Sequence, residues 1–200
     1  MSSVEAYTAL LRLGVPVVET ADAAALLRQS TAAAAQTLAR LARAGLVARV
    51  RHGTWWLSPP VDPYRLPAYL TAPLESYLSL QTALHLHGLI EQVPHVYYVV
   101  SLARTQRIAT IAGTFSIHHV APEVFGGYAD TSTGVRLASP EKALFDVAYL
   151  SAGRSRLFTS LPELSLPRGF RRSELRRWLA KIPSERSRTV TARKLDAWTR

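Results

Sequence analysis

Apolar residues recur at helical spacing in three segments near the start of the chain. The pattern predicts three helices and one extended run, in the order helix Val4–Leu13, extended Val17–Glu19, helix Ala21–Gln29 and helix Thr31–Ala44. Thr20 and Ser30 are of the residue types that cap helix N-termini, and each stands directly before one of these helices. Gly14 and Gly45 follow the first and third helices, as is typical of helix ends.

The third predicted helix is amphipathic. Ala34, Leu38 and Leu41 follow the helical repeat and form one apolar face. We expect the other side to carry the polar residues Gln36, Thr37, Arg40 and Arg43. The alanine run at 32–35 gives the helix high intrinsic propensity and a slim profile.

A β-hairpin is predicted after the third helix, with strands Leu46–Arg51 and Thr54–Leu57 around a His52-Gly53 turn. A turn of two residues places Arg51 opposite Thr54 and each earlier residue opposite the next later one. One face of the hairpin then carries Leu46, Ala48, Val50, Trp55 and Leu57. The other face carries Arg49, Arg51, Thr54 and Trp56.

Three helices followed by a basic hairpin are the element order of a winged helix-turn-helix. In that geometry the helix Thr31–Ala44 enters the major groove while the hairpin lies beside the phosphates. We therefore predict contacts to double-stranded DNA from Ser30, Thr31, Gln36, Thr37, Arg40, Arg43, Arg49, Arg51 and His52. The alternative is a three-helix bundle whose arginines only solvate its surface.

Three prolines within residues 58–63 predict a stiff linker, which separates residues 1–58 from a middle domain at residues 64–152. The middle domain is predicted to hold two helices and four strands: helix Tyr77–His87 before Gly88, strands His95–Leu102, Arg107–Ile111, Thr114–Val120 and Gly134–Ala138, and a helix from Pro140 to Leu150 with Ser139 as N-cap. Ala112-Gly113 is predicted to be a hairpin turn. This mixture predicts an α+β fold with a mostly antiparallel sheet.

Residues 153–200 are predicted to be a basic helical segment packed on the middle domain. Leu175, Trp178, Leu179 and Ile182 share one apolar helix face. The basic residues Arg171, Arg172, Arg176, Arg177 and Lys181 occupy the remainder, and a final helix carries Arg193, Lys194, Leu195 and Trp198. Such a surface suits nucleic acid, an acidic protein partner, or simple solvation.

The distribution of charge along the chain indicates where a nucleic-acid surface would lie. The 200 residues carry a net charge of +10. Residues 1–60 hold six arginines and three acids (+3), residues 61–153 five basic and seven acidic residues (−2), and residues 154–200 thirteen basic and four acidic residues (+9). Any nucleic-acid surface should therefore lie toward the two ends of the chain.

The same composition gives expectations about location. The chain has no cysteine, which excludes disulfides and thiolate chemistry and suits a cytoplasmic protein. We expect no signal peptide, because the N-terminus carries Glu5 and lacks a basic region. Apolar runs such as Val96–Val100 are far too short to span a membrane.

Candidate catalytic and metal-binding residues are few. His85 and His87 point apart on a helix, and His118 and His119 face opposite sides of a strand, so neither pair can chelate alone. The known nucleotide-binding and hydrolase motifs are absent, so we expect no enzyme, no cofactor, no metal and no small-molecule substrate. One alternative remains, a metal-dependent nuclease that uses Glu75, Glu141 and Asp146. The simpler interpretation is that Glu141, in the first turn of its helix, interacts favourably with the helix dipole and that Lys142 forms an ion pair with Asp146.

Three blocks of the sequence resemble the AbiEi-type antitoxin family, in order along the chain. They are Ala72–Ile90, Gly113–His119 and Ala138–Asp146. The family also has an N-terminal winged helix-turn-helix, so the resemblance covers nearly the whole chain.

The resemblance implies an antitoxin that represses its own operon by binding promoter repeats, paired with an AbiEii-like nucleotidyltransferase toxin. It assigns DNA contacts to the winged helix and to positive surface on the C-terminal domain. In this sequence those roles fall to Gln36, Thr37, Arg40, Arg43, Arg49 and Arg51, and to the face from Arg171 to Lys181. A further alternative is a module that only binds the toxin.

Overall fold

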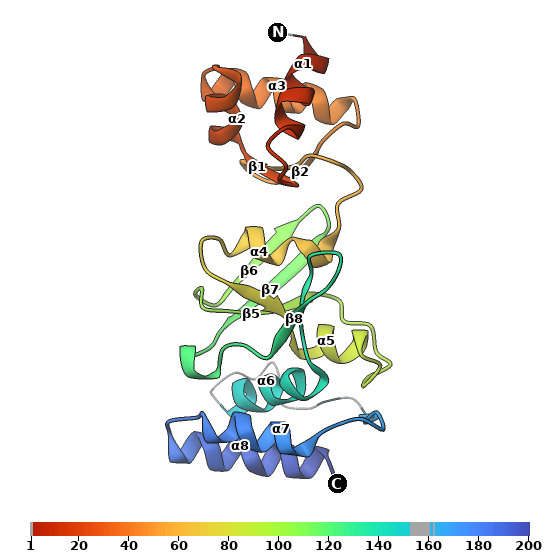
Figure 1. The fold of residues 1–200 in the computed structure, drawn as a ribbon, viewed down its shortest axis with the longest axis vertical. Coiled ribbons are helices and arrows are strands. Elements are labelled where there is room, and N and C mark those ends of the chain that lie inside the picture. Colours follow the sequence, from red (N-terminus) through yellow and green to blue (C-terminus); the bar gives the residue numbers. More distant parts are fainter. Residues whose placement is uncertain (1, 153–160, 162) are drawn as a thin grey trace. The chain divides into compact units, whose positions relative to one another are not determined.

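The computed structural model describes residues 2–152, 161 and 163–200, which form two compact units of mixed α+β structure (Figure 1). The first unit comprises Met1–Pro63 and Ala109–Gly113, and the second comprises Tyr64–Ile108 and Thr114–Arg200. Of the basic segment predicted at 153–200, residues 153–160 and 162 lie outside the described residues.

The first unit contains three helices and a small sheet. Its elements are α1 (Ser3–Leu11), β1 (Val17–Glu19), α2 (Thr20–Leu27), α3 (Thr31–Arg43), β2 (Ala48–Arg51) and β3 (Thr54–Trp56). The strands pair antiparallel in the order β1-β3-β2. Leu10, Leu38, Leu41 and Trp55 join helices and sheet in one buried core. The predicted helices and the extended run at Val17–Glu19 are therefore confirmed.

The two predicted N-caps have different outcomes. Ser30 caps α3, because its hydroxyl accepts from the Ala33 amide at 3.2 Å. Thr20 is not a cap; it is the first residue of α2, and its hydroxyl donates to the Gly53 carbonyl and accepts from Trp55 Nε1 at 2.9 Å. The hydroxyl joins helix to hairpin, so it is not available for capping.

The predicted hairpin forms, but its predicted register is wrong beyond the turn. Arg51 does lie opposite Thr54, whereas Arg49 pairs with Trp55 because a β-bulge occurs between Arg49 and Arg51. Trp56 was expected on the basic outer face, yet it is only 2% exposed. Its indole nitrogen donates to the Ser58 carbonyl, and β3 is the central strand of the sheet.

The second unit is built on a six-stranded sheet, apart from the β6–β7 tip at Ala109–Gly113, which belongs to the first unit. Its strands are β4 (Ser76–Leu78), β5 (Tyr97–Ser101), β6 (Gln106–Thr110), β7 (Gly113–His119), β8 (Tyr128–Asp130) and β9 (Arg136–Ala138). Its helices are η1 (Pro63–Arg65), α4 (Pro67–Leu70), α5 (Leu80–Leu86), η2 (Pro122–Val124), α6 (Pro140–Ala152), α7 (Arg172–Ala180) and α8 (Glu185–Trp198). The strand order is β6-β7-β5-β4-β9-β8.

This sheet corrects two predictions. It is mixed, since β5 pairs parallel with β7 and β4 pairs parallel with β9. The predicted helix Tyr77–His87 is also wrong in its first part, because Ser76–Leu78 is a strand and the helix begins at Leu80. All three residues of that strand are buried, so they lack the alternation that marks a half-exposed strand.

Helix α6 organises the rest of the second unit. Ser139 caps it as predicted, accepting from the Lys142 amide at 3.1 Å. The helix packs against α5, α7 and α8, with α7 and α8 lying side by side (Figure 1). Leu175, Trp178 and Ile182 of the predicted apolar face join the same core, so the C-terminal helices are part of this unit.

Candidate nucleic-acid interface

The exposed side of α3 carries three of the residues predicted to contact DNA. Gln36, Arg40 and Arg43 are exposed, and they line a shallow groove of about 360 Å³ along the helix together with Gln29. Arg40 and Arg43 lie in the last turn of α3, where a cation also stabilises the helix dipole. The structure thus presents an amide and two guanidinium groups on one open face.

Thr37 does not belong to this exposed set. Its side chain is buried, with the residue 3% exposed, and its hydroxyl donates to Gln29 Oε1 at 3.2 Å. The same hydroxyl accepts from an Arg40 guanidinium nitrogen at 3.2 Å. The prediction that Thr37 projects from the outer face is therefore wrong, and the residue instead orients Arg40.

The start of α3 offers two further predicted residues. Ser30 and Thr31 are both exposed. The Ser30 hydroxyl is already engaged by the Ala33 amide, so it caps the helix. Free amides at a helix N-terminus favour anions, so this end of α3 has the polarity that a phosphate requires.

The β2–β3 hairpin holds its basic residues in two different ways. Arg49 is exposed; its guanidinium lies 5.7 Å from the centre of the Trp55 ring and 3.0 Å from Nδ1 of the exposed His52. Arg51 is half-buried and donates from Nε to the Thr54 hydroxyl, which in turn donates to Glu19. Arg49 and His52 therefore face outward, while Arg51 is part of an internal network.

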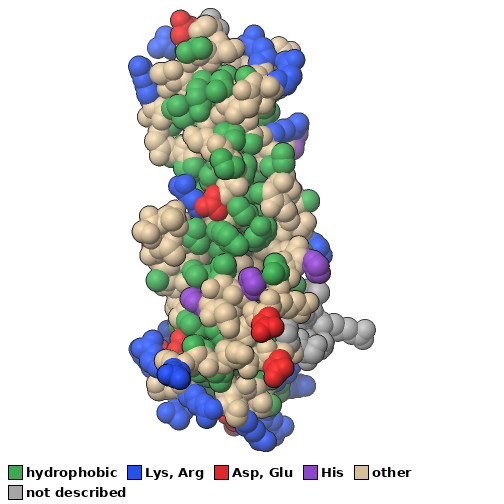
Figure 2. All heavy atoms as spheres, turned by 90° about the vertical axis from the view of Figure 1, so that its right-hand side faces the viewer, with side chains coloured by type: hydrophobic (Ala, Val, Ile, Leu, Met, Phe, Trp, Pro, Cys, Tyr) green, Lys and Arg blue, Asp and Glu red, His purple; other side chains and the backbone are tan. Residues whose placement is uncertain are grey.

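The second group of predicted residues gathers on α7 and its two caps. Figure 2 shows Lys and Arg side chains clustered over α7 and α8. We call the following residues, all exposed, the C-terminal basic surface: Arg171, Arg172, Arg176, Arg177 and Lys181.

Most of these cations also have local structural partners. Arg171 lies 3.7 Å from Glu141, Arg177 pairs with Glu174 at 2.9 Å, and Lys181 Nζ lies 4.0 Å from the centre of the Trp178 ring. Arg172 donates to the Thr199 carbonyl and so joins the start of α7 to the end of α8. Arg176, by contrast, lines an open groove between these helices that also contains Arg200.

A buried ion pair lies beneath this surface. Lys142 Nζ pairs with Asp146 one helical turn along α6, and both side chains are 0% exposed. Asp146 also accepts from the Ser79 hydroxyl at 2.7 Å and from the Tyr77 hydroxyl at 3.2 Å. Lys142 Nζ lies 4.6 Å from the centre of the Trp178 ring.

Burial sets the titration of this pair. Removal from water lowers the pKa of Lys142 and raises the pKa of Asp146, and the attraction between the two charges opposes both shifts. The same burial and the nearby Asp146 charge raise the pKa of Tyr77. The prediction that Lys142 and Asp146 form an ion pair is confirmed, and its complete burial was not foreseen.

The carboxylates of the nuclease alternative are engaged in separate contacts. Glu75 pairs with Arg136 at 3.1 Å, Glu141 accepts from the Arg171 amide, and Asp146 holds Lys142. Within the described part of the chain no group of three or more His, Asp or Glu residues could hold a metal ion.

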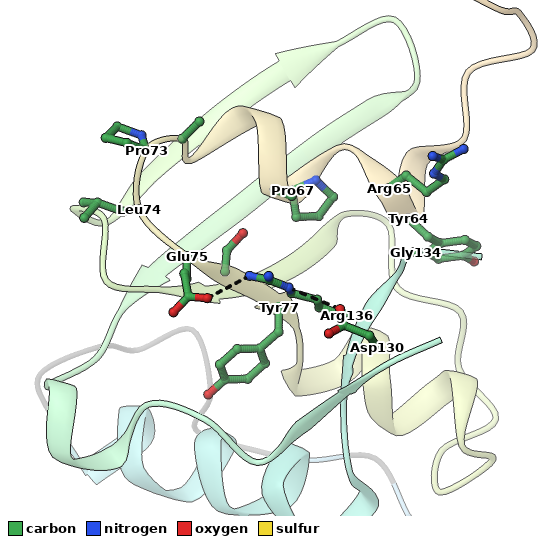
Figure 3. A pocket seen from close by; sticks show the side chains of 13 residues that line it. Tyr64, Arg65, Pro67, Pro73, Leu74, Glu75, Tyr77, Asp130, Gly134 and Arg136 are labelled. Atoms are coloured by element: carbon green, nitrogen blue, oxygen red, sulfur yellow. Dashed lines mark hydrogen bonds and ion pairs between the residues drawn. The ribbon is translucent and has the colours of Figure 1, made fainter. Parts of the chain in front are cut away.

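A cavity of about 350 Å³ beside β4 contains the Glu75–Arg136 pair (Figure 3). Arg136 reaches across it and also contacts Asp130 at 3.3 Å. Glu75 directly precedes β4, Asp130 ends β8 and Arg136 begins β9, and the β4–β9 and β8–β9 pairings bring these positions together. The sequence alone carries no local signal for this arrangement.

A Ser–His pair was also missed. Ser116 Oγ lies 2.9 Å from His118 Nε2, since residues two apart on β7 share a face. His118 is 5% exposed, and desolvation lowers its pKa to about 4. Strand alternation could have suggested this pairing, whereas the adjacent His118 and His119 do face opposite ways.

The fold and these surfaces define a mixed α+β protein with basic residues on both of its units. A scan against protein-family models gives no match to the chain, and a search of curated proteins gives none either. No helix in the described ranges has the length and apolar character needed to cross a bilayer.

Proposed function

We propose that the first unit is a winged helix-turn-helix that binds double-stranded DNA, with α3 in the major groove and the β2–β3 hairpin beside the phosphate backbone. The observation that carries the proposal is the set of outward-facing groups on two adjacent elements: Gln36, Arg40 and Arg43 on α3, and Arg49 and His52 on the hairpin. Guanidinium groups bind phosphates and guanine edges, and an amide can read adenine.

Local geometry supports this assignment. Helices α2 and α3 pack together and are joined by the three residues 28–30, a turn length typical of helix-turn-helix motifs. Arg40 is held by Thr37, and Arg49 is held over Trp55. Side chains that are already ordered lose less entropy on binding than free ones.

We assign the C-terminal basic surface to additional phosphate contacts. Its exposed cations lie on helices of the second unit, in the segment that carries +9 of the net charge. Arg176 and Arg177 are the best candidates, because Arg176 lines an open groove and the Arg177–Glu174 pair is exposed and therefore weak, whereas Arg172 is occupied by the Thr199 carbonyl. A surface of this kind adds affinity without sequence preference.

The biological role that we propose is that of an antitoxin that represses its own operon. Three ordered sequence blocks support it through their resemblance to AbiEi-type antitoxins, and the DNA-binding proposal for the first unit fits it. The partner in this role is a nucleotidyltransferase-like toxin. Co-expression with the adjacent gene product should restore growth to cells that this product inhibits, and continued inhibition would contradict the role.

DNA binding can be tested with a fluorescently labelled duplex from the chain's own promoter. Replacing Arg40, Arg43 and Arg49 together by alanine should weaken binding by about tenfold or more at fixed salt. Arg12→Ala is the matched control, since Arg12 is an exposed arginine of the same unit outside the proposed interface. An unchanged affinity in the triple variant, with its circular dichroism intact, would contradict the assignment.

Salt dependence separates the two surfaces. Each lost phosphate contact should reduce the slope of log affinity against log salt by about 0.9. Arg176→Gln/Arg177→Gln should therefore flatten the slope by about 2 if both touch phosphates. An unchanged slope would remove the C-terminal basic surface from the DNA interface and favour an acidic protein partner.

A further inference from the structure

A second cavity of the second unit is larger than that in Figure 3 and differs from it in chemistry. It measures about 560 Å³ and is enclosed by the segment that precedes β5 and by strands β5, β6 and β7. Ile90, Val93, Pro94 and Val96 supply apolar wall, and Val93 is 66% exposed. The volume lies within the range of pockets that hold small organic ligands.

The Lys, Arg, Asp and Glu residues among the described lining of this cavity carry charge of one sign only, which is positive. Arg107 is the one Lys or Arg among the described lining residues, and none of these residues is Asp or Glu. Arg107 is exposed on β6 and makes no ion pair with the residues that the structure describes. By contrast, Arg136 in the cavity of Figure 3 is already neutralised by Glu75 and Asp130.

The uncharged polar groups of the cavity come from strand β7 and helix α5. The Ser116–His118 pair lines it from β7, and the low pKa of His118 keeps that imidazole neutral at physiological pH. Gln81 lines it from α5, and within the described ranges its Oε1 is the one buried side-chain oxygen or nitrogen without a hydrogen-bond partner. The terminal torsion of glutamine is soft, so this amide can turn to meet a donor group.

We propose that this cavity binds a small, largely apolar carboxylic acid that also carries a hydroxyl group. The carboxylate pairs with Arg107, the body of the ligand packs against Ile90 and Val96, and the donor group meets Gln81. A cation finds no counter-charge here, and a polyanion finds only one. The ligand therefore has a single negative charge.

The test uses three planar probes of equal size class: coumarate, which has both groups, coumaramide, which lacks the charge, and cinnamate, which lacks the hydroxyl. Binding is followed by NMR titration of the full chain with isotope-labelled amides. Coumarate should bind about fivefold to tenfold more tightly than coumaramide. It should bind about threefold more tightly than cinnamate. Shifts should centre on Val96, Tyr98 and Ser116.

Two variants separate the contributions. Arg107→Gln should abolish the preference for coumarate over coumaramide, whereas Arg104→Gln, an exposed arginine just outside the cavity, should leave it unchanged. Gln81→Met should abolish only the preference over cinnamate. Equal binding of coumarate and coumaramide, an unaltered preference in Arg107→Gln, or no binding at about 10 mM would overturn the proposal. None of these readouts depends on DNA binding.

Discussion

The buried pair of Lys142 and Asp146 allows the sharpest test of what holds the second unit together. Asp146→Leu leaves the lysine charge buried at 0% exposure with no opposite charge beside it. Lys142→Met leaves the Asp146 carboxylate with only the Ser79 and Tyr77 hydroxyls as donors. Breaking a buried pair in this way costs about 3–5 kcal/mol, because the remaining charge is uncompensated.

The double variant Lys142→Met/Asp146→Leu removes both charges and keeps similar apolar volume. It should therefore lose about 2 kcal/mol or less, against about 6–10 kcal/mol for the two single variants combined, which gives a coupling free energy of about 4 kcal/mol or more. Trp178 would retain an apolar neighbour in place of the Lys142 stem. Arg177→Met is the control, because the exposed Arg177–Glu174 pair is worth about 0.5 kcal/mol or less.

The measurement is hydrogen exchange of α6 amides read by mass spectrometry, which reports the opening free energy of this unit alone. Urea denaturation followed by far-ultraviolet circular dichroism gives the second estimate. Strictly additive losses in the double variant, or single-variant losses below about 1 kcal/mol, would refute the view that an uncompensated charge dominates.

Two further predictions concern backbone space and pH. Gly127→Ala should destabilise the second unit by about 2 kcal/mol more than Gly134→Ala. Both glycines have a similar positive φ (73° and 76°), but only at Gly127 would an added Cβ meet Trp178, at 2.5 Å. Thermal unfolding measures the two losses of stability, and equal losses would contradict this prediction. Stability should fall between pH 6.5 and about 4, by up to about 3 kcal/mol, because His118 binds its proton in the unfolded chain first. His118→Gln should flatten urea midpoints across this window, and an unchanged pH dependence would show that His118 does not set it.

Helix periodicity predicted the first unit well because its helices are amphipathic and locally capped. Ala34, Leu38 and Leu41 face the core as the spacing requires. The same spacing also indicates that Thr37 is buried, because Thr37 lies three residues after Ala34 and four before Leu41, on the edge of the buried face. Its polarity suggested exposure, but a hydroxyl can be buried when it has partners, here Gln29 and Arg40.

Strand β4 and the long-range strand pairings could not be predicted from the periodicity of apolar residues. Ser76–Leu78 is a short, fully buried strand between β5 and β9, and it runs into α5 without a turn signal. Its apolar character suits helix and strand equally, so periodicity cannot decide between them. The contact of Arg136 with Glu75 depends on which strands become neighbours, and strand order depends on the packing of all the strands of the sheet together.

The C-terminal basic surface lies on α7 and its caps, and the bond from Arg172 to the Thr199 carbonyl ties this helix to the end of α8, while Trp178 lies beneath Lys181. An arginine-rich tail without such anchors must fold as it binds, which adds an unfavourable entropy of ordering and a large negative heat-capacity change to binding. Here the ordering is completed when the chain folds. Docking of a polyanion on these helices should consequently show a small heat-capacity change, with counterion release as its main thermodynamic signature.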